Sequence, residues 1–228
     1  MLVALTRESG HNEELRQLIG PRAEVFELPL TATDFSPTAE VDAELRALRD
    51  FGHFRSLVVT SARCEGYLAL AKDALLDVHE VFSVGPATTA MLERTQWAPS
   101  HESSGTALEL ADAITRGPVL ILAATGGRTE LCEALTHKSL QPQRVECYAT
   151  RDVALDSAER ERLARADVVF IGAPSAWRVA RHLVSPRAWV LVPGTTTLDA
   201  VARDHPRVVV GWGEDFAHAW NVVESSAR

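Results

Sequence analysis

Two segments of this chain place glycine, proline and threonines directly after a short apolar run. Residues 84–89 read VGPATT and residues 192–197 read VPGTTT, and each is followed by a helix-like segment. Glycine and threonine favour helix N-termini and proline favours the first helical turn, so both segments are typical of strand-to-helix turns. Hydroxyl and backbone N–H groups at such a turn can also bind carboxylates or phosphates.

Similar turn segments recur along the whole chain. They occupy residues 6–10, 60–63, 85–89, 103–106, 125–128, 173–175 and 193–197. In a doubly wound sheet, such turns lie at the carboxyl ends of the strands, where ligands bind. Each turn alone is explained by helix capping, but the repeated set favours a cleft that binds an anion.

Signatures of several other chemistries are missing from the sequence. It contains no G-x-S-x-G, no Walker A lysine loop and no G-x-G-x-x-G after the first apolar run. The eight histidines are scattered, without metal-ligand spacing. We therefore expect neither a cofactor nor a metal ion.

Length and composition indicate a cytoplasmic protein. The chain has 228 residues, 46% of them hydrophobic, which suffices for one large core or two modest ones. A net charge of -8 disfavours nucleic acid but allows an anionic small molecule. No apolar window is long enough to span a membrane and no signal peptide is evident. The three isolated cysteines are expected to be reduced and buried.

Short apolar runs alternate with amphipathic segments, which predicts an α/β fold. Consecutive apolar residues in several runs favour parallel strands that are covered on both faces. Helices are expected at 12–19 and 214–225, and from Asp156, where Glu159 completes a capping box. Strands are expected at 2–5, 25–28, 57–60, 81–84, 119–123, 144–148, 168–171, 189–192 and 208–210.

An internal repeat indicates two similar lobes. Val84 and Val192 head the matching segments 108 residues apart, and two further pairs of segments match at offsets of 111 and 120 residues. Residues 31–38 are rich in turn formers and are predicted to be a linker, and residues 149–154 form a second candidate crossing. These patterns allow either one division near the middle or the insertion of one lobe into the other.

The ordered set of motifs resembles the uroporphyrinogen-III synthase family. It comprises a strand ending in Thr-Arg at 6–7, Thr-Ser at 60–61, VGPAT at 84–88, a serine before a helix at 103–108, VLIL with glycine and arginine at 119–128, and a strand ending in tyrosine at 145–148. The resemblance implies two flavodoxin-like lobes joined by a two-stranded connector. It also implies insertion of a lobe at 34–150 into one formed by 1–33 and 151–228.

The implied reaction is the cyclisation of hydroxymethylbilane, a linear tetrapyrrole, with inversion of the last pyrrole ring and loss of water. The substrate loses its hydroxyl readily and closes unaided to the uninverted isomer. The enzyme's task is therefore mainly to orient the chain so that ring closure passes through a spiro intermediate. The partner is this small molecule, and we expect a monomer. The alternative function is a non-catalytic bilobal protein that binds a tetrapyrrole or another anion.

The resemblance also implies site residues. Tyr148 matches a tyrosine proposed in the family to assist departure of the hydroxyl, or it is a packed strand aromatic. Ile171-Gly172 stands where the family has Thr-Ser, and Pro193-Gly194 reverses the usual order. The residues expected to bind substrate are Arg7, Thr60, Ser61, Ala62, Thr88, Ser104, Gly126, Gly127, Arg128, Ser175, Thr195 and Thr196.

Overall fold

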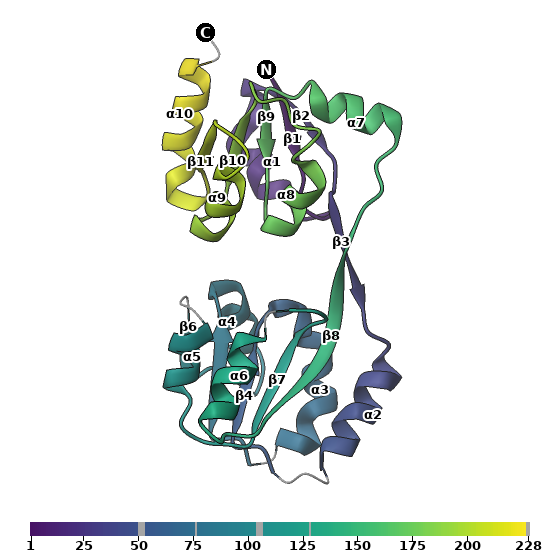
Figure 1. Cartoon of the computed structure of the whole chain (residues 1–228), viewed down its shortest axis with the longest axis vertical. Helices are drawn as coiled ribbons and strands as arrows, with labels where there is room; N and C mark the ends of the chain where they lie inside the picture. Colours follow the sequence, from purple (N-terminus) through teal and green to yellow (C-terminus); the bar gives the residue numbers. More distant parts are fainter. Residues whose placement is uncertain (50–52, 76, 104–106, 128, 227–228) are drawn as a thin grey trace. The chain divides into compact units, whose positions relative to one another are not determined.

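The computed structural model describes residues 1–49, 53–75, 77–103, 107–127 and 129–226 (Figure 1). The chain divides into two compact units. Unit 1 comprises Met1–Thr33 and Arg151–Arg228, and unit 2 comprises Asp34–Thr150. Each unit contains its own sheet, so each is an α/β body with its own core.

Unit 1 contains a five-stranded parallel sheet with the strand order β11-β10-β9-β1-β2. The chain runs from β1 to β2 on one side and returns to β9 on the other side of β1. A topological switch point therefore lies between β1 and β9, where ligands bind in folds of this class. The strands are β1 (Leu2–Leu5), β2 (Glu24–Glu27), β9 (Val168–Phe170), β10 (Trp189–Val192) and β11 (Val208–Val210).

Helices cover both faces of this sheet because its strands are apolar on both sides. Val3 and Leu5 of β1 pack on one face, and Ala4 between them packs on the other. The first face is covered by α1 (Glu13–Ile19) and α10 (Phe216–Ser226). The second is covered by α7 (Ser157–Ala164), α8 (Pro174–Ala180) and α9 (Thr195–Ala202). Short 3-10 turns occupy Gly20–Arg22 and Gly213–Asp215.

Unit 2 contains a six-stranded sheet with the order β3-β8-β7-β4-β5-β6. Its strands are β3 (Thr31–Phe35), β4 (Ser56–Val59), β5 (Glu80–Val84), β6 (His101–Ser103), β7 (Val119–Ala124) and β8 (Pro142–Asp152). The pairs among β4 to β8 are parallel, and the switch point lies between β4 and β7.

The helices of unit 2 also form two layers. One face of the sheet is covered by α2 (Thr38–Arg49), α3 (Glu65–Ala71) and α4 (Pro86–Leu92). The other face is covered by α5 (Ala107–Ala113) and α6 (Glu130–His137). Two 3-10 turns, η2 (Ala62–Cys64) and η3 (Lys72–Leu75), flank α3. The parallel α/β architecture predicted from the sequence is confirmed.

The segment 31–38 contains a strand and is not an irregular linker, although the division between the two units falls within it, after Thr33. Thr31–Phe35 forms β3, which lies beside β8 (Figure 1). The N–H of Val153 donates to Leu30 O at 3.0 Å and that of Ser36 donates to Cys147 O at 2.9 Å, so the two segments run antiparallel. The β-branched threonines suit a strand, and β8 supplies the backbone partners that a linker would lack.

Helix starts were predicted more securely than the small edge elements. Asp156 caps α7, since its Oδ1 accepts from Glu159 N at 2.8 Å and Glu159 Oε2 accepts from Asp156 N at 2.8 Å. The predicted capping box is therefore confirmed. The helix α2 and the three-residue strand β6 were not predicted from the sequence.

Candidate functional site

The turn after β4 lies at the switch point of unit 2. Thr60 directs both its N–H and its hydroxyl toward Leu122 O of β7, at 3.1 and 3.0 Å. Ser61 caps the following 3-10 turn, and its Oγ accepts from Arg63 N at 3.3 Å. Thr60 thus fastens β4 to β7, while Ser61 and Ala62 lie half-buried at the carboxyl edge.

The turn after β7 lies on the other side of the same switch point. Gly126 has a φ of 64°, a left-handed conformation that favours glycine. The N–H of Thr125 donates to Tyr148 O at 2.6 Å, and that of Gly127 donates to Ala124 O at 3.2 Å. The sequence Thr-Gly-Gly therefore folds back tightly onto the ends of β7 and β8.

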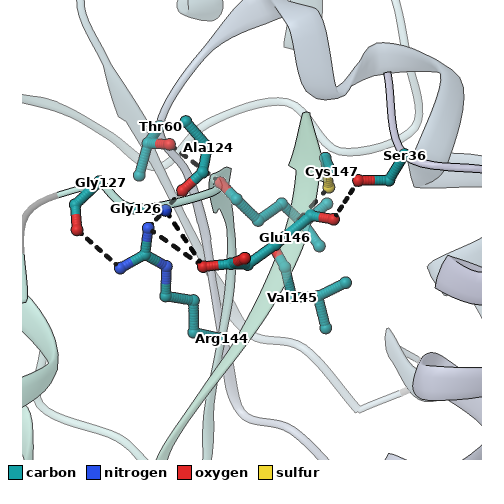
Figure 2. A network of polar contacts seen from close by, with 10 residues as sticks. Ser36, Thr60, Ala124, Gly126, Gly127, Arg144, Val145, Glu146 and Cys147 are labelled. Atoms are coloured by element: carbon teal, nitrogen blue, oxygen red, sulfur yellow. Dashed lines mark hydrogen bonds and ion pairs between the residues drawn. The ribbon is translucent and has the colours of Figure 1, made fainter. Parts of the chain in front are cut away.

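Two charged side chains of β8 hold this turn from below, as Figure 2 shows. Arg144 donates to Gly127 O at 3.0 Å and also to Ala124 O. Glu146 accepts from the N–H of Gly126 at 3.4 Å and lies 3.9 Å from the Arg144 guanidinium. Both partners of the turn are charged, which strengthens the hydrogen bonds that fix its shape.

Sequence reasoning did not select Arg144 and Glu146. The sequence does show charged and apolar residues in alternation here, which is typical of a strand with one buried face. Val145 and Cys147 are buried in the core of unit 2, and the two charged residues face away from it. Only the β7–β8 pairing shows that these charges reach the Thr-Gly-Gly turn.

Tyr148 is placed by an irregularity in β8. The β7–β8 register shifts between Ala123 and Ala124, so that Ala124 pairs with Tyr148 and Cys147 is the extra residue. Because a bulge interrupts the alternation of side chains, Cys147 and Tyr148 join the same core cluster. Tyr148 is only 6% exposed, and its ring centre lies 5.6 Å from the Arg63 guanidinium. A catalytic role for Tyr148 stays a prediction.

The two segments VGPATT and VPGTTT both begin helices, with glycine at the N-cap each time. Gly85 caps α4 with a φ of 81°, and Gly194 caps α9 in an extended conformation. Pro86 therefore occupies the first position of α4, where α9 has Thr195. The reversed Pro193-Gly194 order thus keeps the cap and gives α9 one backbone N–H that α4 lacks.

Aligned as sequences, VGPATT and VPGTTT match Thr88 with Thr196, but counted from the helix N-caps Thr88 matches Thr197. Thr88 is the third residue of α4 and Thr197 is the third residue of α9, and both are buried. The hydroxyl of Thr88 donates to Val84 O at 2.8 Å, so its proton is engaged inside the unit. Thr195 and Thr196 are exposed. Of these hydroxyls, those of Thr195 and Thr196 are accessible to a ligand.

The switch point of unit 1 carries a cation instead of the Thr-Ser pair. Thr6 donates its hydroxyl proton to Phe170 O at 2.6 Å, which joins β1 to β9. The Arg7 guanidinium lies 4.8 Å from the Trp212 ring centre. Ile171 is fully buried, and a Cβ on Gly172 would lie 3.2 Å from Arg7 Cγ. Gly172 therefore leaves room for the Arg7 side chain to cross the carboxyl edge.

The remaining predicted residues are distributed over both units. Ser175 lies half-buried in the first turn of α8, which follows β9 at the carboxyl edge of unit 1. Gly126 and Gly127 lie in the turn held by β8. Ser104 and Arg128 lie outside the described residues. The turns of each unit therefore gather at the carboxyl edge of that unit's own sheet.

The thiols near this edge are poor nucleophiles. A hydrogen bond with Cys147 and, to a smaller extent, burial raise the pKa of the Cys64 thiol far above its usual range. Burial likewise raises the pKa of the Cys132 thiol. Within the described part of the chain, no group of three or more His, Cys, Asp or Glu residues could hold a metal ion. The groups that the carboxyl edges of the two sheets present to a ligand are therefore hydroxyls, backbone N–H groups and guanidinium groups.

Comparison with known proteins adds a sequence match and several structural ones. The family described as uroporphyrinogen-III synthase HemD matches residues 13–210. A mutant uroporphyrinogen III synthase from Thermus thermophilus has a TM-score of 0.71 at 16% identity, with 100% of this chain and 98% of that chain covered. The Helicobacter pylori 26695 synthetase has a TM-score of 0.59 at 14% identity, with 98% of both chains covered. None of the curated proteins matches significantly.

Proposed function

The chain belongs to the uroporphyrinogen-III synthase family, and we propose that it catalyses the family's reaction chiefly by positioning its substrate. That reaction cyclises hydroxymethylbilane to uroporphyrinogen III, with inversion of the last pyrrole ring and loss of water. The substrate carries many carboxylates and closes unaided to the uninverted isomer. Orientation, rather than activation, therefore decides which product forms.

One observation carries this mechanism. Both sheets present, at their carboxyl edges, turns built from glycines, hydroxyls and the N-termini of helices. Such groups bind carboxylates without transferring protons. Arg7 supplies a positive charge at the edge of unit 1, next to Gly172. These groups suit a polycarboxylate that must be held in one conformation.

We assign the substrate contacts accordingly. In unit 2, Ser61 and Ala62 would bind carboxylates, with Thr60 keeping the β4 turn in place. Gly126 and Gly127 would contact the substrate through the shape of their turn, since their N–H groups are engaged by Glu146 and Ala124. In unit 1, Arg7, Ser175, Thr195 and Thr196 would do so. Thr88 would act by stabilising the start of α4, since its hydroxyl proton is engaged by Val84. Arginine is suited to this task because its planar fork pairs with both oxygens of a carboxylate.

Tyr148 is proposed to assist departure of the hydroxyl. Its backbone carbonyl holds Thr125 of the Thr-Gly-Gly turn, so the residue lies directly beside that turn. The Arg63 guanidinium lies 5.6 Å from its ring centre, so a cation also borders this position. This role supplements the positioning by the turns.

No helix among the described residues is long and apolar enough to cross a membrane. We propose that the enzyme is cytoplasmic and monomeric, with the linear tetrapyrrole as its partner. A single species with the mass of one 24.9 kDa chain by light scattering would support the monomer, and a species twice that mass would refute it.

The activity is tested by incubating the purified protein with freshly prepared hydroxymethylbilane. Accumulation of the type III isomer, above that of a heat-inactivated sample, supports the proposal. Formation of only the type I isomer would refute the catalytic activity and leave the alternative function, a non-catalytic binding protein. Thermal stabilisation by an anion without type III formation would favour that second outcome.

A further inference from the structure

A cavity lies at the end of the unit 1 sheet opposite to the turns assigned to the substrate. Its volume is about 400 Å³. Asp167, Trp189 and Arg207, which lie at the starts of β9, β10 and β11, line it together with Arg165, Arg187 and Ala188. Parallel strands begin at one edge and end at the other, so this amino-edge cavity is separate from the carboxyl edge.

The amino-edge cavity is strongly positive. Arg165, Arg187 and Arg207 line it, against the single carboxylate of Asp167. That carboxylate accepts a hydrogen bond from Leu2 N at 2.7 Å. Among the residues that the structure describes, none of the three guanidinium groups has a carboxylate partner. Among the described residues that line the cavity, positive groups therefore outnumber the single carboxylate.

One of the three guanidinium groups, that of Arg207, is held in place. Arg207 donates to Arg187 O at 3.0 Å and lies 5.9 Å from the Trp189 ring centre. The indole N–H of Trp189 is buried and has no hydrogen-bond partner among the described residues. Because the nitrogen itself is buried, a molecule in the cavity would meet the Trp189 ring rather than its N–H. The demand for an anionic oxygen therefore comes from the guanidinium groups, and the ring would sense the binding.

We propose that this cavity binds a compact organic anion with two or more carboxylate or phosphate groups. Its volume falls within the range of small-molecule sites. Alanines and Trp189 give it apolar walls, while the guanidinium groups would pair with the anionic oxygens. The site does not depend on the synthase activity, because it lies at the other edge of the sheet.

Citrate and pyrophosphate are suitable probes for calorimetry on the full chain. The test variant is the double change Arg165→Gln and Arg187→Gln, which leaves the Arg187 carbonyl that accepts from Arg207. The matched control is Arg181→Gln with Arg203→Gln. These two arginines lie at helix C-caps of unit 1, are exposed, and do not line the cavity. Both variants lose the same net charge.

The expected result is at least tenfold weaker binding of one probe by the test variant and less than twofold weaker binding by the control. The Trp189 indole N–H signal, assigned in NMR spectra with Trp189→Phe, should shift when that probe binds. Equal weakening in both variants would reduce the effect to net charge and overturn the proposal. Undetectable binding of both probes, or binding without a shift of the Trp189 signal, would also overturn it.

Discussion

Replacing Arg144 by glutamine tests whether the Thr-Gly-Gly turn is held by β8. The side chain is 16% exposed and donates to two backbone carbonyls, Gly127 O at 3.0 Å and Ala124 O. A hydrogen bond to a charged group contributes roughly 1.5–3 kcal/mol, and glutamine can replace at most one of the two. We therefore expect Arg144→Gln to lower the free energy of unfolding by about 2–3 kcal/mol.

The kinetic effect should separate positioning from folding. With the turn loosened, Gly126 and Gly127 would no longer hold the position that we assign to them in the substrate site, so the KM for hydroxymethylbilane should rise about tenfold. The value of kcat should fall less than threefold, because no reacting group is removed. Arg144→Lys retains the charge but not the planar fork, and should give an intermediate KM.

The assay is the initial rate of type III isomer formation, measured well below the unfolding temperature of each variant. Arg46→Gln is the control, because Arg46 is an arginine of the same unit whose ion pair with Asp42 is 72% exposed on the arginine side. An exposed pair contributes less than about 1 kcal/mol, so this variant should resemble the wild type. A wild-type KM in Arg144→Gln, with or without lost stability, would refute the positioning role.

Three further predictions concern single side chains. Gly172→Ala should raise KM by up to about threefold, because the new Cβ would lie 3.2 Å from Arg7 Cγ and that side chain would have to shift by a few tenths of an ångström; an unchanged KM would show that substrate binding tolerates this shift of Arg7 and that Gly172 is not required there. Tyr148→Phe should slow turnover while leaving the urea midpoint within error, and an unchanged rate would remove Tyr148 from the mechanism. A hydrogen bond from Arg16, supported by one from Asn12, lowers the pKa of Glu27 in the folded state. At pH 7 the free energy of unfolding of the wild type should therefore exceed that of Glu27→Gln by less than about 1 kcal/mol. This difference should disappear as the pH falls through the lowered pKa of Glu27, and a difference that grew in acid would contradict the pairing.

The sequence was informative wherever one local pattern determines the structure. The capping box at Asp156 and the apolar runs of the parallel strands depend on near neighbours, and both were predicted correctly. The strand within 31–38 was not predicted, because it depends on backbone partners in β8, far along the chain.

The site was less accessible to sequence reasoning, for the same physical reason. The burial of Tyr148 depends on a bulge at Cys147, and the register of threonines in α9 depends on which residue is the cap. Neither follows from residue types alone. Arg144 and Glu146 look like ordinary exposed positions of a strand until β7 is placed beside β8. Contacts across a sheet, rather than along the chain, therefore assemble the carboxyl edges.

The proportion of type III product tests the central claim most directly. Fresh hydroxymethylbilane closes unaided to the type I isomer, so the enzyme competes with a background reaction. As the protein concentration rises, the fraction of type III isomer should increase toward complete conversion. A product that remains type I at every protein concentration would contradict the account that this chain inverts the last ring by positioning its substrate.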